Sequence, residues 1–264
     1  MMTVDEARHP VPWRMGGLPP PLSMGAMNMA EVLHQDADLQ ATFDAAIADK
    51  ELRARQAQRE RIDGAMPSWL AFVMRPLAVS ARNQRQRRFQ RQGRGGENLL
   101  TAALRWRLDR TWTLCPDVVV QAGDQEIAQI DLLAVGASSV FILEVKTWKG
   151  AIRATGLRWE RKIGGQWKAV GSPTRQQDMH VKRFRRWLDQ RDIAVEPSTV
   201  QAGIVMMQSE WLRTRDVPFA VFDRPSAVAR WMKTQDERGA PLDTGVRKAL
   251  LSHLIMGGPP EMPG

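Results

Sequence analysis

Between residues 96 and 207, apolar positions recur first at helical and then at strand spacing. Residues 96–108 place Leu100 and Leu104 on one face together with Glu97, which predicts an amphipathic helix. Apolar runs bounded by turn residues then predict strands at 111–121, 126–135, 139–147 and 199–207. The last run is apolar on both faces, so we expect it near the centre of a sheet.

Shorter segments complete this pattern. Residues 151–170 predict short strands separated by glycine turns. Ser172 and Pro173 are a good N-cap and first-turn pair, and they predict a helix that runs to about Arg191. Residues 216–264 are expected to add a strand and two helices that complete or cap the core.

The N-terminal third differs from the rest of the chain in its composition and in its pattern of apolar residues. Residues 1–29 are rich in Pro, Gly and Met without any period, and we expect a disordered tail. Residues 30–63 contain no proline and predict a long helix, which could pack on the main domain or pair two copies into a homodimer. This helix belongs to a helical, Arg-rich extension over residues 30–93, and the main core follows over residues 94–215.

Composition restricts the class of protein. Hydrophobic residues make up 43% and charged residues 25% of the 264, which excludes wholesale disorder, collagen and a disulfide scaffold. The net charge of +9 favours a polyanionic partner, nucleic acid first and an anionic membrane second. The single cysteine, Cys115, fits a reducing compartment. No apolar run reaches the ~20 residues of a membrane span and no signal peptide is visible, so we expect a cytoplasmic protein.

Basic residues gather in two places. Residues 66–96 contain seven arginines and no acidic residue, and residues 153–191 carry a net charge of +8. We expect both segments to contact phosphates, although such runs also occur on faces that meet only water. The residues expected to contact nucleic acid are Arg88, Arg91, Arg94, Arg175, Lys182, Arg183 and Arg186.

Two carboxylates are predicted to face each other on neighbouring strands. A turn centred on Ala137–Ser138 places Asp131 opposite Glu144. Like charges in that position repel unless a cation lies between them, and Mg²⁺ is commonly held by one or two carboxylates with phosphate oxygens. Lys146 follows two residues after Glu144 on the same strand face, so it would enter the same pocket. An ordinary Glu144–Lys146 salt bridge is the alternative.

Four segments in order, "GGENLL", "QIDLLAV", "FILEVKTWKG" and "SPTRQ", cover about residues 94–190. In order and spacing they resemble the nuclease-related domain (NERD), a branch of the PD-(D/E)XK restriction-endonuclease-like superfamily. Gly150 and Trp159 also agree with that family, whereas Ile130 stands where the superfamily often has proline. The resemblance implies a three-layer α/β fold with a central mixed sheet flanked by helices. It also implies metal-dependent hydrolysis of DNA, with RNA not excluded.

The resemblance also implies which residues do the chemistry. The catalytic set carried over from the family consists of Glu97, Asp131, Glu144, Lys146 and Gln176. In this set Asp131 and Glu144, with Glu97, would bind Mg²⁺ or Mn²⁺, and Lys146 would orient or deprotonate the attacking water. Glu97 could instead only complement the N-terminus of its helix.

Several side chains and two other functions stay open. His180 is expected to be structural rather than functional, and Trp148, Trp159 and Trp167 could stack on bases or complete a core. No Gly-rich phosphate loop or Gly-x-Ser-x-Gly elbow occurs, so we expect no nucleotide cofactor. The alternatives to a nuclease are a non-catalytic nucleic-acid-binding module and an assembly or membrane-surface adaptor.

Overall fold

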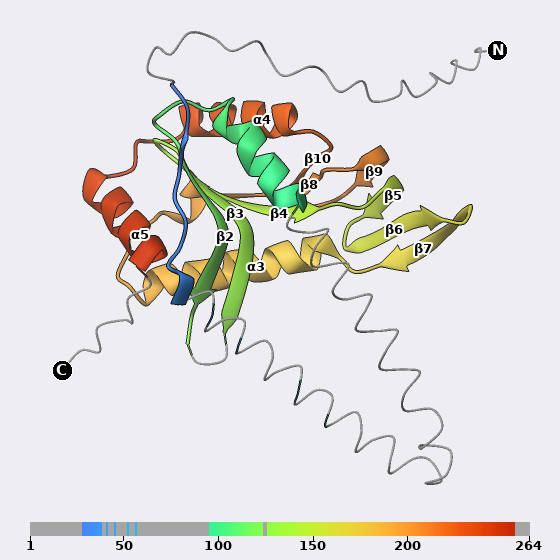
Figure 1. Ribbon diagram of the computed structural model, residues 1–264, viewed down its shortest axis with the longest axis horizontal. Coiled ribbons are helices and arrows are strands. Elements are labelled where there is room, and N and C mark those ends of the chain that lie inside the picture. Colours follow the sequence, from blue (N-terminus) through green and yellow to red (C-terminus); the bar gives the residue numbers. More distant parts are fainter. Residues whose placement is uncertain are drawn as a thin grey trace.

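A computed structural model of the protein describes residues 28–38, 95–123 and 126–256, together with the single positions 41, 45, 52 and 56. Its centre is a six-stranded mixed sheet (Figure 1). In spatial order the strands are β1 (Glu31–Val32), β2 (Thr113–Gln121), β3 (Ile127–Val135), β4 (Val140–Lys146), β8 (Val200–Met206) and β10 (Ala220–Phe222). Strands β2, β3 and β4 pair antiparallel, whereas β8 is parallel to both β4 and β10, and β1 is parallel to β2.

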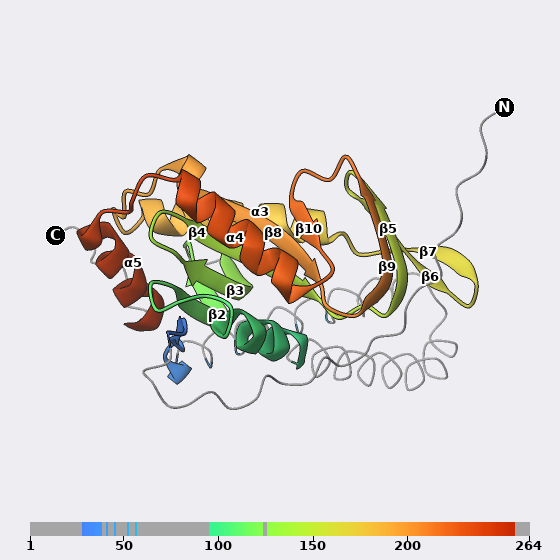
Figure 2. The same ribbon diagram turned by 90° about the horizontal axis from the view of Figure 1, so that it is seen from above.

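A second, four-stranded sheet stands at one end of the first (Figure 2). Its spatial order is β7 (Gln166–Val170), β6 (Arg158–Ile163), β5 (Gly150–Thr155) and β9 (Ser209–Arg215). Residues 147–149 lead from β4 directly into β5, and the chain likewise passes from β8 into β9. The backbone N–H of Met207 donates to the carbonyl of Lys146 at 2.8 Å. This hydrogen bond joins the two connections that lead from the first sheet to the second.

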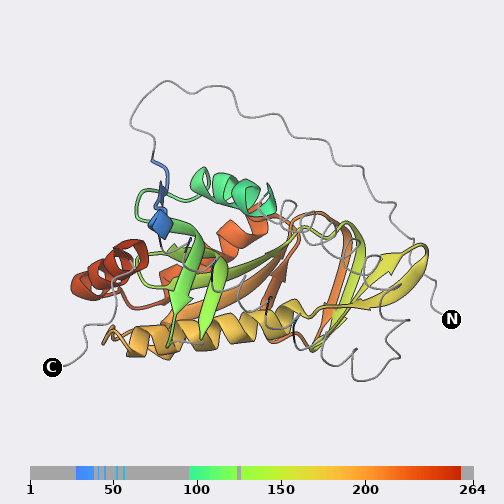
Figure 3. The same cartoon turned by 60° about the horizontal axis from the view of Figure 1, so that its bottom comes forward.

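Helices cover both faces of the main sheet. Helix α3 (Pro173–Asp189) lies along one face and the helical residues 95–105 lie on the other (Figure 3). Helices α4 (Pro225–Arg238) and α5 (Thr244–Met256) and a 3-10 turn (Pro197–Thr199) complete the elements. No helix within the described ranges is long and apolar enough to cross a bilayer.

The alternation of side chains along the central strands produces two apolar cores. Leu133 and Ile142 pack with Phe184 of α3 on one side of the sheet. Their neighbours Leu132 and Leu143 point to the other side, where they pack with Leu100. The prediction of an α/β fold with a mixed sheet flanked by helices is therefore confirmed.

Most predicted elements between residues 96 and 256 are present, and their boundaries shift by a few residues. Ser172 caps α3 as expected, because its side chain accepts from the N–H of Arg175. Strand β9 was not predicted. Its sequence has only Trp211 and Leu212 as large apolar residues, and most of its length is exposed.

The prediction of a helix beginning at residue 30 is wrong at its start. Glu31 and Val32 form β1, because the N–H of Glu31 donates to the Trp112 carbonyl and that of Leu33 to the Leu114 carbonyl. Residues 37, 38, 41, 45, 52 and 56 are helical. The rest of the expected 30–63 helix, the tail up to residue 27 and the arginine run at 66–94 lie outside the described residues.

Candidate active site

The predicted carboxylates lie where β3 and β4 separate. The antiparallel pairing runs from Val135↔Val140 to Leu132↔Leu143, as the sequence-based register predicts, and then stops. One residue further on, the Asp131 carboxylate accepts a hydrogen bond from the backbone N–H of Val145 at 2.7 Å. The Asp131 side chain therefore replaces a backbone partner of Val145 at the point where β4 stops pairing with β3.

Glu144 is the most enclosed charged residue of this group, with no exposed surface. It forms an ion pair with Lys146 Nζ, and its Oε2 lies 3.3 Å from Nδ1 of His180. Neither carboxylate oxygen has a hydrogen bond of regular geometry. Because a buried carboxylate is costly unless its lone pairs are satisfied, the donor set fits a cation shared with Asp131.

The pKa shifts of Asp131 and Glu144 also favour a cation between the two carboxylates. Burial raises the pKa of Asp131 above its usual range. Burial, and then the charge of Asp131, raise the pKa of Glu144 further. Two carboxylates that resist ionisation next to each other ionise more readily when a divalent cation neutralises them.

Lys146 remains charged in this arrangement. Burial alone would lower the pKa of its ammonium, but the charges of Glu144 and Asp131 outweigh burial and raise it. Its Nζ also donates to Gln176 Oε1 at 3.1 Å. The ammonium is therefore a fixed positive charge and hydrogen-bond donor.

Helix α3 brings two further side chains to the site. Gln176 and His180 are four residues apart and so share one helix face, which meets Lys146 and Glu144. Burial first, and then the charges of Lys146 and Arg183, lower the pKa of His180 to about 4, so the imidazole is neutral near pH 7. The sequence favoured a structural histidine, yet the spacing from Gln176 was a usable signal for its place.

The sequence did not single out Gln177. It is fully buried, and its Nε2 donates to the carbonyl of Ile142 at 2.6 Å, which holds α3 against β4. This contact fixes the height of the helix over the strand that carries Glu144.

Glu97 approaches from the opposite face of the sheet. Its charge raises the pKa of both Glu144 and Lys146, although it is a smaller cause than burial. The helical residues come close to the end of β4 because Gly96 has no side chain, since a Cβ there would lie 2.1 Å from Thr147 Cγ2. Within the part of the chain that the structure describes, no three His, Cys, Asp or Glu side chains gather into a metal-binding group. The burial and raised pKa values of Asp131 and Glu144 make this pair fit a metal, and Glu97 adds its negative charge to their surroundings.

The basic residues predicted to contact nucleic acid differ in their exposure and in the partners that they contact. Arg175 is exposed on the first turn of α3, and Lys182 forms an ion pair with Asp178 at 2.7 Å. Arg183 donates to the backbone carbonyl of Ile127 at 2.7 Å, and Arg186 forms an ion pair with Glu126. These two arginines attach α3 to the start of β3. Arg88, Arg91 and Arg94 lie outside the described residues.

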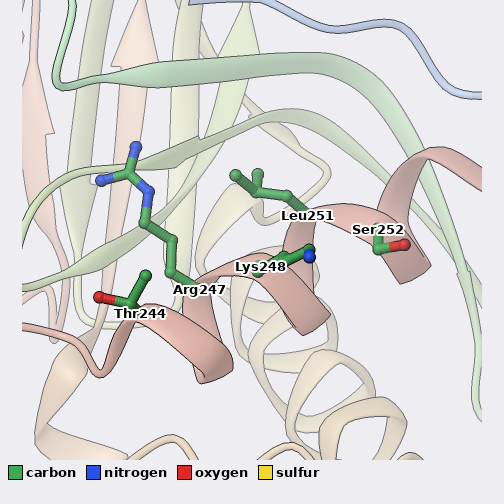
Figure 4. A pocket seen from close by; sticks show the side chains of 5 residues that line it. All are labelled: Thr244, Arg247, Lys248, Leu251 and Ser252. Carbon is green, nitrogen blue, oxygen red and sulfur yellow. The ribbon is translucent and has the colours of Figure 1, made fainter.

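A pocket of about 390 Å³ lies on α5 (Figure 4). Its lining residues are Thr244, Arg247, Lys248, Leu251 and Ser252. The guanidinium of Arg247 donates to the carbonyls of Gly136 (3.0 Å) and Thr111 (2.7 Å), so it serves the fold. Figures 1 and 2 place α5 at the end of the molecule opposite the second sheet.

Residues 92–202 match the family model of the nuclease-related domain, NERD. The chain contains a nuclease-related domain. The matched range includes Glu97, Asp131, Glu144, Lys146 and Gln176, and it ends inside β8. Placement in the PD-(D/E)XK superfamily is consistent with this domain. No curated protein and no solved structure matches the chain.

Proposed function

We propose that this NERD domain hydrolyses DNA phosphodiester bonds with a divalent cation, Mg²⁺ or Mn²⁺. The observation that carries the proposal is the state of Glu144. Its carboxylate is fully buried, has no regular hydrogen bond, and lies next to Asp131 and a charged lysine. An ionised carboxylate in such a position lowers the stability of the folded protein, and a bound cation offsets this cost.

Asp131 and Glu144 would hold the cation, with phosphate oxygens and water as its other ligands. When bound, a cation of this kind neutralises charge on the phosphate and lowers the pKa of a water molecule. The N–H of Val145 keeps Asp131 turned toward β4 through its 2.7 Å hydrogen bond. The protein thus fixes one carboxylate by the backbone and the other by burial.

Lys146 would bind the phosphate and orient the attacking water. Its ammonium carries a full positive charge, and Gln176 Oε1 at 3.1 Å limits the positions of Nζ. Such a preorganised charge stabilises the negative charge that develops on the phosphate during hydrolysis. His180, neutral and buried against Glu144, excludes water from the far side of that carboxylate.

The test is cleavage of supercoiled plasmid in Mg²⁺, in Mn²⁺ and in EDTA. We expect nicking by the wild type in either metal and none in EDTA. Glu144→Gln and Asp131→Asn keep the side-chain shape but remove a charge that holds the metal, so each should lower the rate by at least ~100-fold.

Glu210→Gln is the matched control, because Glu210 is an exposed carboxylate on β9, outside the site. It should cleave as the wild type does. Cleavage by Glu144→Gln at the wild-type rate would refute the proposal. Metal-independent binding of DNA with no cleavage in any metal would favour a non-catalytic binding module.

A further inference from the structure

The second sheet has one face in the core and one face turned outward. Ile152, Ala154 and Trp159 point inward and pack against Ile204 and Met206 of β8. Because successive side chains on a strand alternate between faces, the residues between them point away from the main body. This outer face belongs to the strands that continue directly from the candidate active site.

Two tryptophans meet across the outer face. Trp211 on β9 pairs with Ala151 on β5, and Trp167 on β7 pairs with Lys162 on β6. The indole rings of Trp167 and Trp211 approach to 6.0 Å between centroids, although two strands separate their backbones. The small side chain of Ala151 leaves room for this approach. Trp211 remains 47% exposed, so much of its ring is open to a ligand.

Positive charge surrounds the two rings. The guanidinium of Arg153 lies 4.4 Å from the centroid of the Trp167 ring. Arg153 and Arg158 share the carboxylate of Glu160, at 2.8 Å and 2.9 Å. Lys162 and Arg213 add two further exposed cations. We call this surface the tryptophan face, and it comprises Trp167, Trp211, Arg153, Arg158, Lys162 and Arg213.

We propose that the tryptophan face binds single-stranded nucleic acid. Bases would stack on Trp167 and Trp211, and the phosphates between them would meet the surrounding cations. Exposed aromatic rings flanked by Lys and Arg on a sheet are the combination that single strands use, because every base offers an aromatic face. An anionic membrane fits less well, because the outward side chains of these four strands include no aliphatic residue larger than alanine.

This inference goes beyond hydrolysis, because it assigns a second contact surface and does not depend on metal or on Glu144. Only three residues separate the start of β5 from the end of β4 at Lys146, so the two surfaces belong to one continuous piece of backbone. A single strand held on the tryptophan face would therefore stay close to the site where cleavage is proposed.

The experiment is fluorescence anisotropy of labelled oligothymidylate and oligouridylate of about 15 nucleotides, in EDTA, with the full chain. Trp167→Ala/Trp211→Ala should weaken binding of the strands by about tenfold or more. Trp167→Phe/Trp211→Phe keeps aromatic rings and should recover most of the affinity. Trp106→Ala is the matched control, because Trp106 is 59% exposed but lies beyond the helical residues 95–105 on another part of the surface.

Several outcomes would overturn the inference. One is wild-type affinity in the double alanine variant when circular dichroism shows that it is folded. Another is loss of binding to phosphatidylserine vesicles with no loss for oligonucleotides. If wild type and Glu144→Gln bind equally but neither cleaves, the proposed hydrolysis fails while the tryptophan face stands. If cleavage is metal-dependent but the double alanine variant binds oligonucleotides normally, the proposed hydrolysis stands and the proposed role of the tryptophan face fails.

Discussion

At the scale of single residues, Glu144 makes the stability of the metal-free protein depend on pH. Its pKa is raised in the folded state from an ordinary value of 4.5, chiefly by burial. The folded state therefore favours the protonated acid. The stability that the protonated Glu144 side chain preserves is fully present at pH values below its pKa in the unfolded state. It is lost as the pH rises through the pKa of Glu144 in the folded state.

We expect Glu144→Gln to gain stability relative to the wild type as pH rises from about 5 to about 8, by about 1 kcal/mol or more. Urea unfolding in EDTA at these two values measures the difference. Glu210→Gln should follow the wild-type curve. A constant difference between wild type and Glu144→Gln across the range would mean that Glu144 titrates at its ordinary pKa.

The residues of the site differ in how far the sequence could predict them. Asp131, Glu144 and Lys146 were accessible because strand alternation and a short turn determine which side chains share a face. Gln177 was not, because its contact with Ile142 depends on how α3 packs over β4. For His180, the spacing from Gln176 indicated the helix face but not the contact with Glu144. The same limit applied to Arg183, whose partner is a backbone carbonyl 56 residues away.

At the scale of elements, the β3–β4 hairpin is held by a carboxylate from α4. Asp236 is 9% exposed and accepts hydrogen bonds from the N–H groups of Ala137 (3.0 Å) and Ser138 (2.7 Å). Gly136 allows this approach, since a Cβ there would lie 2.3 Å from Asp236 Oδ1. Asp236 therefore fixes the register of the hairpin at its turn, the end opposite to Asp131 and Glu144.

Asp236→Ala leaves both N–H groups without their acceptor, and it should reduce the free energy of unfolding by about 2–3 kcal/mol. Chemical denaturation measures this as a lower midpoint with an unchanged slope. The neighbouring Glu237→Ala is the control, because Glu237 is exposed. Equal midpoints for the two variants would show that the turn does not need Asp236.

Short elements were the hardest to predict at this scale. Strand β9 is mostly polar because only one of its faces meets the core, and its single strong signal, Trp211, points outward. Strand β1 has two residues and derives its conformation from pairing with β2, which no local pattern records. The longer strands and α3 were predictable because each carries a full apolar stripe.

At the scale of the whole molecule, a cation bound at the site should stabilise the fold as a unit, since a ligand that binds only the native state shifts the unfolding equilibrium. Asp131 and Glu144 belong to central strands that pack against helices on both faces, so relief of their repulsion acts on the main core. Mn²⁺ or Mg²⁺ at about 100 times its dissociation constant should add about 2.7 kcal/mol to the free energy of unfolding. Thermal unfolding with and without metal measures the shift.

The shift should be larger at about pH 8 than at about pH 6, because the raised pKa values of both carboxylates make protons compete with the metal. Asp131→Asn should abolish it, and Glu210→Gln should leave it intact. An equal shift in Asp131→Asn would place the bound cation elsewhere on the protein. A shift that is present in the wild type and absent in Asp131→Asn would locate metal binding at the end of β4 even before any substrate is known, because this readout needs no cleavage.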